Sequence, residues 1–209
     1  MLKAKIGKSV DPVVRKVFPF LFKRPIDPNL LTVVGTLICM AAAVVFAFDL
    51  RAGAIILCLG GLFDLVDGVV ARHHGTESNF GAFLDSTLDR LVDMAILLGV
   101  LMFYARAGEP WLVLLVGWVL MASVMVSYAK ARAERFVEQF EGGIMERAER
   151  MGLVALGGLI GLMQPMLWIV AIGSTITVGQ RFGLAYRAMN ALEARGKPVS
   201  EHHPSTSLP

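Results

Sequence analysis

The sequence predicts an all-α integral membrane protein with six transmembrane helices, preceded by an amphipathic helix that lies in the membrane interface. Of the 209 residues, 56% are hydrophobic, and the mean hydropathy of +0.64 is too high for an ordinary soluble domain. Apolar runs of about 20 residues, the length that crosses a bilayer core, recur along the chain. Both cysteines, Cys39 and Cys58, lie inside such runs, so we expect packed thiols and no disulfide.

Residues 1–24 form the expected interfacial helix. Apolar side chains such as Ile6 and Phe18 are interspersed with lysines and arginines, a composition that binds the surface of anionic membranes. Pro12 and Pro19 would start or kink such a helix. A basic segment that remains in solvent is the alternative interpretation.

Six apolar segments follow. The short connections at 49–51, 106–110 and 164–165 make the helices that they join antiparallel neighbours. On the fifth segment, Gly157 and Gly161 have the spacing of small residues that pack closely against another helix. The predicted spans are Asn29–Phe48, Ala52–Arg72, Phe80–Tyr104, Pro110–Glu134, Glu146–Met163 and Pro165–Arg187.

The distribution of basic residues predicts how the helices are oriented in the membrane. Of the 20 Lys and Arg residues, only Arg51 and Arg106 fall on the loops of one side. Because basic loops stay in the cytoplasm, we expect both termini to be cytoplasmic in a multi-pass protein of the cell (inner) membrane. The expected divisions are the interfacial helix at 1–24, a six-helix domain at 25–190 and a flexible cytoplasmic tail at 191–209.

Two neighbouring spans carry four aspartates, Asp64 and Asp67 on the second span and Asp85 and Asp89 on the third. A carboxylate at the bilayer centre costs about 2.5–3.5 kcal/mol on insertion scales, so these side chains must face a polar interior. Each pair shares one helix face, at i,i+3 and i,i+4. At about 1.5 Å per residue, both pairs lie in the cytoplasmic half of a core about 30 Å thick.

Converging carboxylates provide the hard oxygen ligands that Mg²⁺ or Mn²⁺ prefers. Two such ions would neutralise the acids and accept phosphate oxygens. Pairing with Arg72 and Arg90 is the alternative, but two cations cannot neutralise four acids. Gly68 and Ala71 remove bulk beside Asp67, which leaves room for a nucleotide.

The acids and small residues form one pattern at fixed spacing, Asp64-x2-Asp67-Gly68-x2-Ala71-Arg72-x8-Gly81-x3-Asp85-x3-Asp89. With this pattern the chain resembles the CDP-alcohol phosphotransferase family. The resemblance implies an integral membrane enzyme, usually a homodimer, that uses two metal ions. Such enzymes move a phosphatidyl-type group from a CDP-linked lipid, such as CDP-diacylglycerol, to an alcohol and release CMP.

The resemblance also implies roles for single residues. The four aspartates would hold metal, and Asp89 is also the candidate general base. A carboxylate bonded to metal is normally too acidic for that task, so Asp89 fits it only where its coordination is weak or absent. Pro28 and Thr32 match two further family positions at the start of the first span, although an ordinary helix start explains them equally well. The CDP-lipid would be framed by Pro28, Thr32, Asp67, Gly68, Ala71, Arg72 and Gly81.

Four basic residues near the cytoplasmic ends of later spans are candidates for binding the acceptor: Lys130, Arg132, Arg150 and Arg181. Converging cations suit an anionic acceptor such as a polyol phosphate. The preference of basic residues for cytoplasmic ends is the alternative, and it explains Arg181, inside a span, poorly. The surrounding segments look like those of the phosphatidylinositol-phosphate synthases of the family, which use inositol 1-phosphate. Glycerol 3-phosphate, or an archaeal-type lipid donor, is the nearest alternative.

Two other classes of membrane protein also bury acids. A carboxylate-lined transporter would not need the fixed Gly, Ala and Arg positions. A membrane prenyltransferase would be expected to have more spans and differently spaced acids. Nucleic acid is not among the expected partners. Glu77, Asp93 and Ser127 receive no role from the sequence, although Ser127 could bond an acceptor hydroxyl.

Overall fold

The computed structural model describes residues 28–74, 78–137, 140 and 142–194. The predicted interfacial helix at 1–24 therefore lies outside the described residues, as does the tail from 195 onward. The side chains of six predicted site residues also lie outside this description, although their backbones belong to described helices. These residues are Pro28, Asp64, Asp67, Gly68, Ala71 and Arg72.

The described residues form six α-helices and no strand, which confirms the all-helical prediction. The helices are α2 (Pro28–Phe46), α3 (Leu50–His74), α4 (Asn79–Arg106), α5 (Pro110–Ala133), α6 (Arg147–Ile160) and α7 (Met163–Ala194). Among the described residues, three helices (α2, α5 and α7) are long and apolar enough to cross a membrane. In α3 the shorter stretch Leu50–Phe63 is apolar, because the charged segment of the signature follows it.

Two predicted span lengths were wrong. The fifth helix has 14 residues, about 21 Å at 1.5 Å per residue, and stops before the predicted end at Met163. Gly161 ends it in the left-handed region, with φ 75°, a conformation that glycine adopts without strain. The last helix continues to Ala194, past the predicted end at Arg187.

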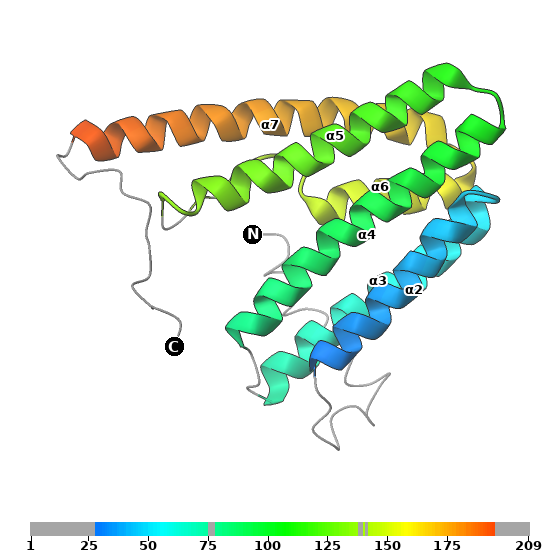
Figure 1. The fold of residues 1–209 in the computed structure, drawn as a ribbon, viewed down its shortest axis with the longest axis horizontal. Helices are drawn as coiled ribbons and strands as arrows, with labels where there is room; N and C mark the ends of the chain where they lie inside the picture. Colours follow the sequence, from blue (N-terminus) through cyan, green and yellow to red (C-terminus); the bar gives the residue numbers. More distant parts are fainter. Residues whose placement is uncertain (1–27, 75–77, 138–139, 141, 195–209) are drawn as a thin grey trace, which may run out of the picture.

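The helices are arranged in two groups that converge at one end of the molecule. In Figure 1, α2, α3 and α4 run together, while α5 and α7 lie alongside each other and diverge from them. The short helix α6 lies between the groups and packs on both α3 and α7. A hydrogen bond from Trp118 Nε1 to Thr175 Oγ1, at 3.0 Å, also joins α5 to α7.

Two of the three tight connections were predicted correctly, whereas the third, predicted at 164–165, lies at 161–162 because α7 already begins at Met163. Asp49 begins α3 by accepting hydrogen bonds from the backbone N–H groups of Arg51 and Ala52, at 2.8 and 2.9 Å, as a helix-capping carboxylate does. Pro110 stands in the first turn of α5, where its missing N–H is not needed. These turns place Arg106 beside the α2–α3 connection, with its guanidinium 4.4 Å from the centre of the Phe48 ring.

Glycines allow the closest helix contacts. A Cβ at Gly158 would lie 2.6 Å from the backbone oxygen of Leu50, so α6 approaches α3 directly at this residue. Gly161, which was predicted to pack against another helix, instead ends α6 and has open space around it. Gly157 packs against the start of α7 at Met163. Close packing is therefore confirmed for Gly157 and wrong for Gly161, and Gly158 makes a closer approach that was not predicted.

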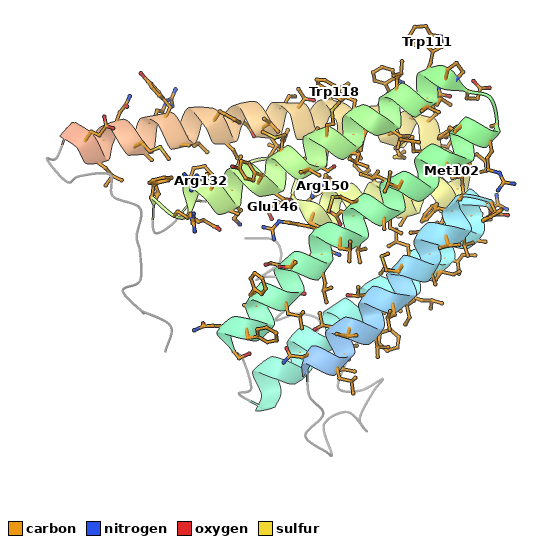
Figure 2. All side chains as sticks on the ribbon, viewed as in Figure 1. Met102, Trp111, Trp118, Arg132, Glu146 and Arg150 are labelled. Atoms are coloured by element: carbon orange, nitrogen blue, oxygen red, sulfur yellow. The ribbon has the colours of Figure 1, made fainter. Side chains whose placement is uncertain are left out.

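The outer surface of the bundle is apolar. Trp111, at the start of α5, is 80% exposed, and Figure 2 shows it projecting from the end where α4 and α5 meet. Met102 and Trp118 are also exposed, and such a surface is typical of a protein that contacts lipid. Both cysteines are free, Cys39 buried and Cys58 exposed, which agrees with the prediction of no disulfide.

Candidate active site

The start of α4 carries one half of the predicted metal site. Ser78 begins this helix by accepting a hydrogen bond from the backbone N–H of Gly81, at 2.9 Å. Asp85 and Asp89 follow on successive turns, and both are partly buried. The packing of α2 against α4 brings the start of α2 close, since a Cβ at Gly81 would lie 3.0 Å from Asn29 Oδ1. The structure thus brings the predicted Gly81 to the helix that begins at Pro28.

The other half of the predicted metal site lies on the last turns of α3. The backbone of this segment is helical to His74, and α4 begins at Asn79, so the two aspartate segments lie on consecutive helices, on either side of a short connection. Among the described side chains, no three acidic, histidine or cysteine residues are grouped to hold a metal. The carboxylates of Asp85 and Asp89, one turn apart, nevertheless fit a hard divalent cation in their chemistry.

Asp89 is bound by an arginine that the sequence did not single out. Arg147, in the first turn of α6, places its Nη1 2.9 Å from Asp89 Oδ1 and its Nε 3.1 Å from Asp93 Oδ1. One guanidinium therefore spans two carboxylates on successive turns of α4. Asp93 in turn accepts a hydrogen bond from Arg150 Nη2 at 3.0 Å through its second oxygen. We call this series, Asp89–Arg147–Asp93–Arg150, the ion-pair chain.

The inner half of the ion-pair chain is almost completely buried. Asp93 is 5% exposed and Arg150 1% exposed. Arg150 also donates through Nη1 to the backbone oxygen of Met145, at 3.3 Å, while its buried Nε has no partner among the described residues. A buried ion pair of this kind persists only where charges and hydrogen bonds compensate desolvation.

Arg181 reaches the same region from α7. It is 3% exposed and donates to two backbone carbonyls, that of Gly142 at 2.9 Å and that of Val126. Gly142 belongs to the same connection as Met145, the backbone partner of Arg150. These bonds give Arg181 a structural role inside a span that the sequence did not predict.

Lys130 and Arg132 lie at the end of α5 and are more accessible. Lys130 Nζ lies 3.8 Å from Glu134, and the Arg132 guanidinium lies 5.2 Å from the centre of the Phe136 ring. Figure 2 shows Arg132 toward the end of α5, and Arg150 near Glu146 at the start of α6. The structure therefore divides the four predicted acceptor cations into a buried pair, Arg150 and Arg181, and a more accessible pair at the end of α5, Lys130 and Arg132.

A cavity of 180 Å³ opens between α4 and α5. Asp93 lines it together with Ser127 and Ser123, and the buried Ser123 hydroxyl has no partner in the described structure. The sequence left Asp93 without a role and did not select Arg147. Spacing was the only feature of the sequence that could have selected these two residues. Asp93 continues the i,i+4 series from Asp85 and Asp89, and Arg147 precedes Arg150 by one helical turn.

This arrangement combines acids on α4 with buried guanidinium groups from α6 and α7. Acids at this depth can bind cations, and guanidinium groups with unused donors can bind phosphate. The ion-pair chain links the two groups, and Figure 2 shows Arg150 apart from the end that carries Trp111. The site is therefore suited to bringing a metal-bound phosphate and an anionic partner together.

Comparisons with known proteins agree with this chemistry. The family model for CDP-alcohol phosphatidyltransferase matches residues 26–179. A phosphatidylinositol phosphate synthase of Streptomyces avermitilis is 40% identical over 178 residues, which cover 78% of this chain and 73% of that protein. An archaetidylinositol phosphate synthase of Pyrococcus horikoshii is 37% identical over 198 residues, 91% of this chain and 98% of that protein.

Solved structures show the same fold. The crystal structure of Mycobacterium tuberculosis phosphatidylinositol phosphate synthase with CDP-DAG bound has a TM-score of 0.75 and 32% sequence identity, covering 85% of this chain and 93% of that chain. The same protein has been solved in complex with manganese and citrate, again with a TM-score of 0.75. The chain described here belongs to the CDP-alcohol phosphatidyltransferase family and is an enzyme of that class.

Proposed function

We propose that this enzyme transfers the phosphatidyl group of CDP-diacylglycerol to inositol 1-phosphate, forming phosphatidylinositol phosphate and releasing CMP. The observation that carries the proposal is the buried pair Arg150 and Arg181, of which Arg150 belongs to the ion-pair chain that ends at Asp89. Arg150 Nε has no partner among the described residues, so an acceptor that bears its own phosphate could form a charge-assisted hydrogen bond with it, which a neutral alcohol cannot do. The names of the bacterial relatives support the same substrates.

The metal site of the proposal consists of Asp64, Asp67, Asp85 and Asp89, with two Mg²⁺ or Mn²⁺ ions. The relative solved with manganese supports a divalent cation. When bound, such ions would stabilise the charge that develops on the departing CMP. The CDP moiety would be framed by Pro28, Thr32, Asp67, Gly68, Ala71, Arg72 and Gly81.

The remaining steps are assigned to the chain's own side chains. Lys130 and Arg132 attract the acceptor phosphate at the accessible end, and Arg150 and Arg181 hold it deeper in the bundle. Asp89 then accepts the proton of the attacking hydroxyl. Arg147, which donates to Asp89 Oδ1, fixes the direction of that carboxylate.

We further propose that all six helices cross the cell membrane, with the active site and both termini in the cytoplasm. Two observations support this arrangement: consecutive helices run in opposite directions, and the exposed surface is apolar. The interfacial helix at 1–24, the transmembrane catalytic domain at 25–190 and the tail at 191–209 remain predictions, as does a homodimer.

A second lipid donor is supported by one comparison. The Pyrococcus horikoshii relative, whose name indicates an archaetidyl product, matches 91% of this chain. An archaeal-type CDP-lipid is therefore the alternative donor, with the same acceptor and the same chemistry.

The test is CMP release by purified enzyme with Mg²⁺. CDP-diacylglycerol and an archaeal-type CDP-lipid serve as donors, and inositol 1-phosphate, free inositol and glycerol 3-phosphate as acceptors. Asp85→Asn is the inactive control, because it preserves the size of the side chain and removes its charge. We expect CMP release with inositol 1-phosphate to exceed release with free inositol at least tenfold. Equal use of both acceptors would refute the proposed acceptor.

A further inference from the structure

Arg147 contacts a proposed metal ligand, and the proposed reaction gives it only the task of orienting Asp89. It lies in the first turn of α6, and its guanidinium bonds to Asp89 and Asp93 at 2.9 and 3.1 Å. The Arg147 and Asp89 side chains are 28% and 15% exposed. The contact is thus shielded enough for the charge of Arg147 to act strongly on Asp89.

The second contact holds the arginine in place. Asp93 receives Arg147 on Oδ1 and Arg150 on Oδ2, so the three side chains form one continuous ionic contact. Arg150 is fixed by Met145 as well. The position of Arg147 is consequently determined from the interior of the protein rather than by solvent.

We propose that Arg147 is a positioning residue that shares Asp89 with the metal site and weakens the binding of the metal by that aspartate. The inference rests on the proposed function, which makes Asp89 a metal ligand and Arg150 an acceptor ligand. A guanidinium bonded to Oδ1 competes with a cation for the same oxygen and repels it. Through Asp93, the ion-pair chain also connects the metal-binding end of the site to the acceptor-binding end.

The ability of the guanidinium to bond two carboxylates at once is essential to this role. Its donors are rigidly spaced and can bond two carboxylates at once, whereas a lysine carries a similar charge on a single nitrogen. Arg147→Lys should therefore preserve the electrostatic effect on the metal and lose the fixed geometry. Arg147→Gln should lose both.

The experiment measures binding of Mn²⁺ alone to the detergent-purified full chain by electron paramagnetic resonance. We expect Arg147→Gln to tighten Mn²⁺ binding roughly three- to tenfold, because a charge that opposes the cation has been removed. Arg147→Lys should bind Mn²⁺ like the wild type. If Arg147 instead supported metal binding by orienting Asp89, Arg147→Gln would weaken Mn²⁺ binding. That result would overturn the proposal.

Arg90→Gln is the matched control. Arg90 follows Asp89 directly in α4, but its Nη1 donates to the backbone oxygen of Ser86, at 2.6 Å. Arg90→Gln removes the same charge at the residue next to Asp89 in the sequence and leaves the contact of Arg147 with Asp89 in place. Tightening in Arg90→Gln as large as in Arg147→Gln would mean that only the net charge matters, which would also overturn the proposal.

Turnover provides the second measurement. Both Arg147 variants should lower kcat at least tenfold, with little change in KM for the CDP-lipid, since neither preserves the bridge to Asp93. A wild-type kcat in Arg147→Lys would contradict the requirement for a guanidinium that bonds both Asp89 and Asp93. If Arg147→Gln does not fold, Arg147→Met, an uncharged side chain of similar reach, replaces it.

The Mn²⁺ measurement separates this inference from the proposed function. If wild-type enzyme released no CMP with inositol 1-phosphate, the proposed acceptor would be wrong. Tighter Mn²⁺ binding in Arg147→Gln would still support the shared aspartate. The reverse combination, normal CMP release with unchanged Mn²⁺ affinity in Arg147→Gln, would leave the function intact and refute the role of Arg147.

Discussion

Asp93 and Arg150 form an ion pair inside the helical bundle, with Arg150 Nη2 3.0 Å from Asp93 Oδ2. The pair joins α4 to α6 across 57 positions of the sequence. Breaking a buried pair by removing one partner typically costs about 3–5 kcal/mol, because the other charge stays buried. Removing both partners together costs much less.

This pair leads to a prediction about stability. Asp93→Leu should lower the thermal unfolding temperature of the detergent-purified protein markedly, because Arg150 would lose its buried counter-charge. The double variant Asp93→Leu with Arg150→Met should unfold at a higher temperature than Asp93→Leu alone. Asp49→Asn, which keeps a capping oxygen at an exposed turn, is the control and should differ little from the wild type. A double variant less stable than the single one would contradict this interpretation.

A second prediction concerns the contact between α2 and α4. A Cβ on Gly99 would collide with the backbone oxygen of Ala43, which cannot move without displacing α2. Gly99→Ala should therefore destabilise the protein by about 1–3 kcal/mol through overpacking. Gly117 in α5 has open space at the same position, so Gly117→Ala should be neutral or stabilising by up to about 1 kcal/mol. Unfolding temperatures of the two variants give the comparison, and equal shifts would refute it.

The sequence predicted the parts of the fold that depend on local pattern. Apolar length located six helices, and residues such as Asp49 and Pro110 located the turns between them. The end of α6 was predicted too late because several apolar residues follow Gly161. Only the left-handed conformation of that glycine shows that the helix has ended.

The ion-pair chain could not be predicted in the same way. Whether Arg147 faces Asp89 depends on how α6 is rotated relative to α4, and no local pattern fixes that rotation. Arg181 raised a similar difficulty, since its partners are backbone carbonyls at Val126 and Gly142. A backbone oxygen leaves no trace in the identity of a residue, so the structural role of this arginine was invisible in the sequence.

The third prediction concerns the metal site. Asp64→Asn, Asp67→Asn and Asp85→Asn should each abolish CMP release, while the protein still inserts and folds. A metal ion supplies several kcal/mol of charge stabilisation in the transition state, and the loss of one ligand should remove much of that contribution. The measurement is turnover at saturating Mg²⁺, with membrane insertion checked in parallel. Turnover close to wild type in all three variants would contradict the assignment.

The fourth prediction concerns orientation in the membrane. Tags at both termini should be accessible only from the cytoplasm, because Arg51 and Arg106 are the only basic residues on the loops of the opposite side. Protease accessibility in intact and permeabilised cells tests this expectation. Cleavage of the tail after Gly196 from outside intact cells would overturn it.

The last prediction separates the two pairs of acceptor cations. Alanine at Lys130, Arg132, Arg150 or Arg181 should raise KM for inositol 1-phosphate roughly tenfold or more, because a charge-assisted hydrogen bond contributes about 1.5–3 kcal/mol. KM for the CDP-lipid should change little. Arg150→Ala and Arg181→Ala should also lower the unfolding temperature, since both side chains bond to the backbone of the α5–α6 connection.

Arg135→Ala is the control for this series. Arg135 is an exposed basic residue just beyond α5, at the same end of the bundle, and it has no assigned role in binding. Its removal should leave KM and stability near wild type. A rise in KM confined to the CDP-lipid would move the four cations to the donor site. The same pattern of variants with glycerol 3-phosphate as the preferred acceptor would retain the pocket and change its substrate, because the phosphate that these cations bind is common to both acceptors.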